Sequence, residues 1–404
     1  MKYGMLWNAG GNVIYLACQW VITVLVTRIT GFEDAGVLSL AMSLGTTLQT
    51  ISMFGIRNFQ VSDMDNEYRN STYVAFRHIT SFAALAVCIV FSIISDYTEK
   101  QFWAIAFYML FRLAESYSDV LHGIAQKNDR LDIAGKALAI KAIFTTVAFF
   151  IGYISLDSLN LGLALMAIAS VLTTVLYDYT VVRSIERFSL FDTLNRCFSL
   201  AKKTLPLCIY MFLFSAISTI PKMVLEIICD EATLGAYSSI YAPATLIQAA
   251  TAYIYNPFAT LFALFHRNRD YAQFFKTLIK ITAFIIALSG IVLLLASLIG
   301  EWALVILFGE SIREHAHLLI PILLVTVLMA ILGFFCMLEI ILRDFTGLIT
   351  ACALGAVSSL VLSIILINTN GVTGTSIALI ISAAAAVSVT LLSILLKIRK
   401  FKNA

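Results

Sequence analysis

Long apolar runs separated by short polar stretches follow one another along the whole chain. A helix of about 20 apolar residues crosses a hydrocarbon core of about 30 Å. The pattern therefore predicts an all-α, polytopic membrane protein with about twelve transmembrane helices. The predicted spans lie near residues 8–29, 35–57, 75–95, 102–126, 133–154, 158–182, 204–228, 234–264, 276–299, 316–342, 346–367 and 373–396.

The basic residues between these spans are distributed unevenly. With the N-terminus placed in the cytoplasm, the inner loops, tails and inner span ends hold 21 of the 27 Lys and Arg residues. The outer side then holds only Arg28, Lys100 and Arg313. Because cytoplasmic loops of membrane proteins carry an excess of Lys and Arg, we expect both termini in the cytoplasm. This orientation also agrees with an even number of spans.

The two halves of the chain resemble each other. A shift of 199 residues places Gly36 on Gly235, Ser39 on Ser238, and Arg77 on Lys276. Six spans per half give both halves the same orientation. We therefore predict two six-helix bundles, residues 1–190 and 191–404, related by a pseudo-two-fold axis along the membrane normal. A substrate path is expected between such halves.

Composition excludes several classes of function. The chain is 60% hydrophobic and only 13% charged, against about 25% charged in soluble domains. Its basic residues are dispersed in short loops, which argues against nucleic-acid binding. None of the seven cysteines forms a CxxC pair or a ligand set with the five histidines, so no metal site and no cofactor are expected. HExxH, P-loop and GxSxG motifs are absent, and we predict that the protein is not an enzyme.

Charged residues inside the predicted spans are the candidates for function. Ionisable side chains within a membrane are costly and usually mark a substrate or ion pathway. The basic candidates are Arg112, Lys141 and Lys222, and the acidic ones are Glu115, Asp119, Asp178, Glu226 and Glu339. Asp178 and Glu339 lie near predicted cytoplasmic ends, where a solvated or end-capping role is an equal alternative.

The span at residues 102–126 carries the densest group of charges. Spacings of three and seven residues place Arg112, Glu115 and Asp119 on one helix face. There they can neutralise one another or face water. A structural ion cluster between helices is the alternative to a polar pathway through the membrane.

The three intramembrane cations are predicted to bind an anionic group that crosses the membrane. Arg112 suits phosphate through its planar donor fork, whereas Lys141 and Lys222 act as point charges. The candidates for balancing this charge, or for binding a coupling H⁺ or Na⁺, are Glu115, Asp119 and Glu226. Lys222 and Glu226 also have the spacing of an intrahelical pair next to Pro221.

Two segments carry a resemblance to a known family. The run from Arg112 through Glu115, Asp119 and Gly123 to Arg130 and Lys136 resembles the fourth-span and fourth-loop signature of polysaccharide repeat-unit flippases. The segment Gly55-Ile-Arg57-Asn58-Phe59-Gln60-Val-Ser-Asp63 is similar to that family as well. These are the O-antigen and capsule transporters of the multidrug/oligosaccharidyl-lipid/polysaccharide exporter superfamily.

The resemblance implies a flippase in the bacterial cytoplasmic membrane. Such a protein moves an undecaprenyl-pyrophosphate-linked oligosaccharide from the inner to the outer leaflet by alternating access. It implies the lipid bilayer, a lipid-linked oligosaccharide and a coupling H⁺ or Na⁺ as partners, with a polysaccharide polymerase as a further candidate. A cation-coupled multidrug exporter of the same superfamily is the alternative, and a membrane glycosyltransferase, polymerase or ligase is a third.

Overall fold

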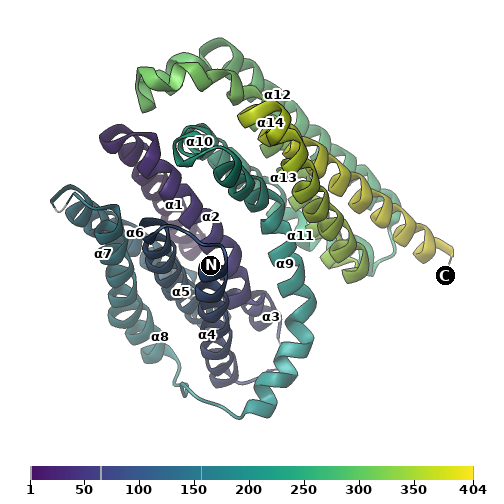
Figure 1. Cartoon of the computed structure of the whole chain (residues 1–404). Coiled ribbons are helices and arrows are strands. Elements are labelled where there is room, and N and C mark those ends of the chain that lie inside the picture. The colour runs from purple at the N-terminus through teal and green to yellow at the C-terminus, as the bar shows by residue number, and fades with distance from the viewer. Residues whose placement is uncertain (1, 64–65, 156, 404) are drawn as a thin grey trace. The chain divides into compact units, whose positions relative to one another are not determined.

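The computed structural model describes residues 2–63, 66–155 and 157–403, and every regular element within them is a helix (Figure 1). The predicted all-α fold is confirmed. The chain forms two compact units, one with residues up to Leu25 and Val37–Ser215, the other with Val26–Gly36 and the chain from Ala216 onward. The division into segments 1–190 and 191–404 stays a prediction.

The first unit takes most of its helices from the first half of the chain. Two long helices, α1 and α9, begin in this unit and end in the second one. The elements are α1 (Lys2–Thr30), α2 (Phe32–Met53), α3 (Ile56–Ser62), α4 (Asn70–Ile94), α5 (Glu99–Lys127), α6 (Leu131–Ser155), α7 (Leu159–Thr173), the π-helix η1 (Thr174–Tyr179), α8 (Thr180–Ile185) and α9 (Leu194–Ile228).

The second unit contains the remaining helices. They are α10 (Glu231–Tyr255), the short 3-10 helix η2 (Asn256–Phe258), α11 (Ala259–Arg267), α12 (Tyr271–Phe308), the 3-10 helix η3 (Glu310–Leu318), α13 (Leu319–Ile341) and α14 (Phe345–Asn403). A non-helical residue, Gly371 with φ 56°, divides α14 into two arms. The last two predicted spans lie on these two arms.

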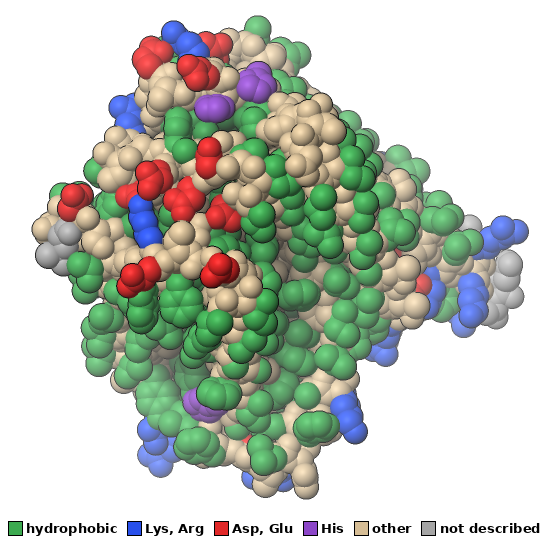
Figure 2. Space-filling view, viewed as in Figure 1, with side chains coloured by type: hydrophobic (Ala, Val, Ile, Leu, Met, Phe, Trp, Pro, Cys, Tyr) green, Lys and Arg blue, Asp and Glu red, His purple; other side chains and the backbone are tan. Residues whose placement is uncertain are grey.

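All twelve predicted spans lie on helical segments in the structure. In the described part of the chain, eight helices are long and apolar enough to cross a membrane. Large apolar side chains are also exposed on these helices, as at Phe82 (75%), Leu298 (72%) and Trp302 (68%). Figure 2 shows broad hydrophobic areas on the visible face of the molecule. Such surfaces suit lipid rather than water, and the protein is a multi-pass membrane protein.

Small residues let helices approach closely at two crossings. A Cβ on Gly11 of α1 would lie 2.1 Å from the carbonyl oxygen of Gly135 in α6. In the second unit, a Cβ on Gly36 would lie 1.9 Å from the carbonyl oxygen of Glu231. Only glycine allows these backbone contacts, which is the usual means of close packing between membrane helices.

A sharp break separates α2 from α3. Phe54 and Gly55 both have positive φ values, 49° and 65°. A Cβ at Gly55 would lie 2.8 Å from Cβ of Leu207 in α9, so glycine is required by space as well as by conformation. The predicted span over residues 35–57 is therefore two helices that meet at a bend, and the bend places Arg57 on the first turn of α3.

Candidate substrate site

Helix α5 carries most of the polar side chains of the candidate site. A capping box starts the helix, because Thr98 accepts from the Gln101 backbone N–H and the Gln101 side chain accepts from that of Thr98. The helix packs against α3, α4, α6 and α7 in the first unit. Its polar residues therefore meet side chains from several neighbouring helices.

Arg112 and Glu115 form an ion pair on α5. Nη1 of Arg112 lies 2.6 Å from Oε2 of Glu115, and both side chains are largely buried. Tyr15 of α1 completes the group, because its hydroxyl donates to Glu115 and accepts from Nη1 of Arg112 at 3.2 Å. Nη2 of Arg112 donates to the hydroxyl of Thr46 at 3.1 Å. The expected neutralisation of Arg112 is thus provided by Glu115.

The third member of the predicted triad, Asp119, has different partners. Its Oδ1 lies 3.3 Å from Nη1 of Arg57 in α3, and its Oδ2 lies 3.2 Å from Nη2 of Arg77 in α4. Arg77 is fully buried and also donates to the carbonyl oxygen of Ser52. One carboxylate therefore faces two guanidinium groups, which leaves the cluster with a net positive charge.

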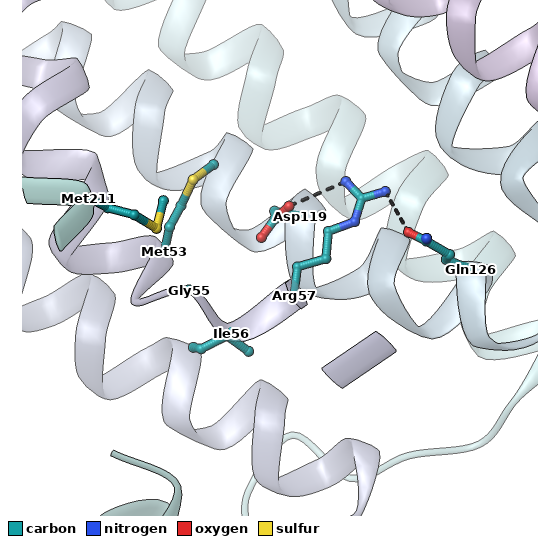
Figure 3. A pocket seen from close by; sticks show the side chains of 7 residues that line it. All are labelled: Met53, Gly55, Ile56, Arg57, Asp119, Gln126 and Met211. Atoms are coloured by element: carbon teal, nitrogen blue, oxygen red, sulfur yellow. Dashed lines mark hydrogen bonds and ion pairs between the residues drawn. The ribbon is translucent and has the colours of Figure 1, made fainter. Parts of the chain in front are cut away.

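A pocket of about 320 Å³ opens beside this cluster (Figure 3). Within it, Nη2 of Arg57 donates to Oε1 of Gln126 at 3.1 Å, so the guanidinium bridges Asp119 and the amide. The Arg57 side chain is 28% exposed, whereas that of Arg77 is not exposed at all. The pocket is lined by Met53, Gly55, Ile56, Arg57, Asp119, Gln126 and Met211.

Lys141 of α6 lies in a separate and fully buried network. Its Nζ donates to the hydroxyl of Thr174 at 2.8 Å and lies 3.4 Å from Oδ2 of Asp178. The Ser118 hydroxyl of α5 also bonds to both Lys141 and Asp178. Nε2 of His122, one turn further along α5, lies 3.2 Å from Oδ1 of Asp178. The lysine and aspartate side chains are 2% and 1% exposed.

The π-helix η1 supplies two members of this network. Its first residue, Thr174, and its fifth, Asp178, are both buried against α5 and α6. A π-helix changes the register of side chains within a longer helix and is often found at functional sites. The suggestion of a solvated or end-capping Asp178 is wrong, since this carboxylate is buried and paired.

The remaining predicted residues lie in the second unit. Nζ of Lys222 in α9 lies 4.1 Å from the ring centroid of Tyr241 in α10, which is a cation–π contact. Glu226 follows one turn later and is half-buried. The structure thus places Lys222 and Glu226 in one unit and the residues Arg112, Glu115, Asp119 and Lys141 in the other.

Four polar residues of the site were not predicted as candidates, namely Arg57, Arg77, His122 and Gln126; Asp178 was a candidate, with a solvated or end-capping role as the alternative. Arg57 and Arg77 were among the basic residues counted on the inner side of the membrane. Two signals in the sequence pointed to them: Arg57 and Gln126 lie within the segments that resemble the flippases, and Arg77 lies inside a predicted span. The distance of these residues from a span end along the sequence did not reveal that Arg57, Arg77 and Gln126 lie around Asp119.

Comparison with known proteins places this geometry in context. The chain matches a family model described as polysaccharide biosynthesis protein over residues 2–261. It is 23% identical over 311 residues to the capsular polysaccharide biosynthesis protein CapF of Staphylococcus aureus. The matched region covers 76% of this chain and 78% of CapF.

Two solved structures show the same fold. The lipid II flippase MurJ in an inward closed conformation has a TM-score of 0.75 and 13% identity, over 97% of this chain and 87% of MurJ. A multidrug resistance MATE family transporter of the MOP superfamily, in an inward-facing conformation, has a TM-score of 0.71 and 14% identity, over 99% of both chains. The fold is thus that of a class of multi-pass membrane transporters.

The chain belongs to the polysaccharide biosynthesis protein family, whose model covers more than half of it. The resemblance found in the sequence is confirmed at this level.

Proposed function

We propose that this protein is a flippase for a lipid-linked oligosaccharide repeat unit. It moves an undecaprenyl-pyrophosphate-linked oligosaccharide from the inner to the outer leaflet of the bacterial cytoplasmic membrane for surface polysaccharide assembly. Membership of a polysaccharide biosynthesis family and a fold like that of a lipid II flippase support this substrate class. The observation that carries the proposal is the pocket lined by Arg57, Asp119 and Gln126.

The charge of this pocket suits a diphosphate. Arg57 and Arg77 share the single carboxylate of Asp119, so one positive charge is left over. The Arg57 guanidinium is partly exposed in the pocket, and its planar fork matches phosphate oxygens in a bidentate way. A diphosphate that enters the pocket can replace Asp119 on Arg57, while the buried Arg77 continues to neutralise Asp119. The substrate thus binds without leaving a carboxylate unpaired.

The other cations fit this scheme to different degrees. Arg112 is paired with Glu115, and an incoming anion that competes with this carboxylate would find a second guanidinium on the same helix face as Asp119. Lys141 as a phosphate ligand stays a prediction, and its contact with Asp178 supports a structural role instead. Lys222 stays the predicted cation of the second unit.

Transport without a nucleotide site requires another source of energy. We propose alternating access between the two leaflets, driven by an ion gradient, with both termini in the cytoplasm as the 21 basic residues on one side predict. The headgroup passes through a polar path while the lipid tail stays in the bilayer. The cation-coupled exporter is the alternative, but a guanidinium in the pocket suits an anionic rather than a cationic substrate.

A leaflet-access assay tests the proposal. Purified protein in liposomes would receive three fluorescent substrates that share one lipid: an oligosaccharide on a diphosphate, the same sugar on a neutral linker, and the lipid diphosphate without sugar. An impermeant quencher then reports movement between leaflets. We expect the diphosphate oligosaccharide to move faster than the neutral analogue. Equal movement of both, or of neither, would refute the proposed substrate class.

A further inference from the structure

The second unit contains a buried carboxylate. Glu339 lies near the end of α13 and has no exposed surface. In the described part of the chain, neither of its two oxygens makes a hydrogen bond. The neighbouring Leu338 and Leu342 belong to a buried apolar cluster with Ile394 and Ile398 of α14. The suggestion of a solvated or end-capping Glu339 is therefore wrong.

An ionised carboxylate is not stable in such surroundings. Transfer of an unpaired charge into an apolar interior is so costly that the group takes up a proton instead. The same holds within a membrane, where intramembrane acids commonly serve in proton transfer. Burial therefore favours the protonated form of Glu339, and the groups beside it show where its proton can go.

A cradle of polar groups lies beside Gly347, where α14 packs along α13 (Figure 1). The position that a Cβ of Gly347 would take lies 3.1 Å from Oε1 of Glu339 and 1.9 Å from Oγ of Ser393. Glycine at this position is what leaves room for the carboxyl and the hydroxyl on the same side of α14. The Ser393 hydroxyl in turn donates to Oδ2 of Asp344 at 3.5 Å.

Exposure increases in steps along this series of groups. Glu339 is buried, the side chain of Asp344 is 16% exposed, and that of Lys397, whose Nζ lies 3.6 Å from Oδ2 of Asp344, is 28% exposed. Arg343, in the turn between α13 and α14, is exposed. The series thus leads from the apolar interior to the end of the helix pair.

We infer that Glu339 is a proton-binding site of this protein, connected to the aqueous phase through Ser393 and Asp344. The Glu339 carboxyl gives its proton to Oγ of Ser393 while the Ser393 proton moves to Oδ2 of Asp344. Asp344 then releases the proton to water. Each transfer moves one proton, so the total charge is unchanged; while Asp344 holds the proton, Lys397 is a cation within electrostatic range of the ionised Glu339.

Other titratable groups near this site set its electrostatic surroundings. His266 at the end of α11 contacts the rings of Tyr271 in α12 and Phe401 in α14, and it lies within electrostatic range of Arg343 and Lys397. Of the charges near this helix pair, Lys397 of α14 and its partner Asp344 act on Glu339. Lys397 favours loss of the proton from Glu339, and Asp344 opposes it.

The role of this proton in coupling rests on the proposed flippase function, whereas the proton site itself does not. Movement of the two arms of α14 relative to α13 would change the access of Ser393 to Glu339. A proton taken up or released at Glu339 is then tied to one conformation of the helix pair.

A hydrophobic carbodiimide tests the site directly, because it reacts with buried protonated carboxyls. We expect Glu339 in the purified protein at about pH 7 to label more than about tenfold faster than the exposed Glu310, since a free glutamate with a pKa of about 4.3 is almost fully ionised there. Glu339→Gln should remove the label, and Ser393→Ala should keep it. Failure of Glu339 to label between about pH 5 and about pH 9, or protection by Na⁺ at constant pH, would overturn the proton site.

Transport in liposomes with an imposed pH gradient tests the coupling. The wild-type protein should move the diphosphate oligosaccharide several-fold faster with the gradient than without it, and Glu339→Gln and Ser393→Ala should lose this response. A labelled protein whose transport ignores the gradient would refute the coupling and leave the flippase function intact. Labelling of Glu339 without transport of any substrate would refute the flippase function and leave the proton site.

Discussion

Gly36 and Gly235 meet in a reciprocal contact. A Cβ on Gly36 would strike the carbonyl oxygen of Glu231, and a Cβ on Gly235 would strike that of Phe32, at 1.9 and 1.8 Å. The shift of 199 residues that superposes the two halves of the sequence converts Gly36 into Gly235 and Phe32 into Glu231. Residues near a two-fold axis make such reciprocal contacts with their own equivalents. The contact thus joins equivalent positions of the predicted repeat.

This contact predicts an unusual effect of alanine. Alanine normally stabilises a helix relative to glycine by about 1 kcal/mol. Gly36→Ala and Gly235→Ala should instead lower the thermal stability, by about 1–3 kcal/mol, since the new methyl group meets backbone atoms that cannot rotate away. Gly290→Ala in α12 is the matched control, because nothing lies within 4 Å of its Cβ position. Thermal unfolding in detergent would measure all three, and equal stability of Gly36→Ala and Gly290→Ala would contradict the contact.

The buried pair of Lys141 and Asp178 predicts a loss of folded protein. Lys141→Ala leaves the Asp178 carboxylate buried without its cation, although His122 remains beside it, and breaking such a pair costs about 3–5 kcal/mol. We expect low abundance of Lys141→Ala in the membrane and recovery in Lys141→Ala with Asp178→Asn. A stable Lys141→Ala protein that has lost transport would argue for the phosphate-binding role that the sequence predicts.

The pair of Arg112 and Glu115 is expected to behave as a unit. Arg112→Ala leaves Glu115 and Tyr15 without their cation, and Glu115→Gln removes the carboxylate from beside Arg112. Each single change should lower stability, and the double change should cost less than the sum of both, with a coupling of about 1–3 kcal/mol. Additive effects in a double-mutant cycle on unfolding would show that the two side chains act independently.

A pH-dependent element lies outside the spans, at Asp63 after α3. Burial raises the pKa of Asp63, but the backbone N–H groups of Glu67 and Tyr68 and the hydroxyl of Tyr73 outweigh it and hold the pKa below its ordinary value. A lowered folded-state pKa means that the stabilisation is complete above the unfolded pKa of about 3.9 and is lost as the pH falls through the folded value.

We therefore expect protease cleavage around Tyr68 to be slow at neutral pH and to increase only below about pH 4. Asp63→Asn should make cleavage fast and independent of pH, because the amide is a weaker acceptor for these donors. Asp270→Asn, at the start of α12, is a control that should leave cleavage near Tyr68 unchanged. Identical pH profiles for the wild-type protein and Asp63→Asn would contradict this account.

Whether a contact could be predicted from the sequence depends on how far apart its residues lie along the chain. The helices and the pairing of Arg112 with Glu115 depend on local spacing, which the sequence displays directly. The partners of Asp119 come from α3 and α4, and they reach it only because the chain bends at Gly55. Likewise, Asp178 lies deep in the protein through the register of the π-helix η1. Such side chains cannot be placed by counting residues from a span end.

The last prediction concerns Arg57, whose position in the pocket carries the proposed function. Arg57→Ala removes the partly exposed guanidinium but leaves Asp119 paired with Arg77, so the protein should fold. A hydrogen bond to a charged group contributes about 1.5–3 kcal/mol, which corresponds to about a tenfold to hundredfold weaker affinity for the lipid diphosphate.

Arg57→Lys separates charge from shape at this position. It should recover part of the affinity, since lysine supplies the charge without the bidentate fork. Arg196→Ala is the matched control: this exposed arginine pairs with Asp192 away from the pocket, and its loss should change affinity little. Competition by inorganic pyrophosphate would measure affinity for all variants, with membrane abundance recorded in parallel. Without Arg57, the residues that line the pocket, among them Asp119 and Gln126, include no cation. Full affinity in a stable Arg57→Ala protein would therefore show that the diphosphate binds elsewhere in the chain.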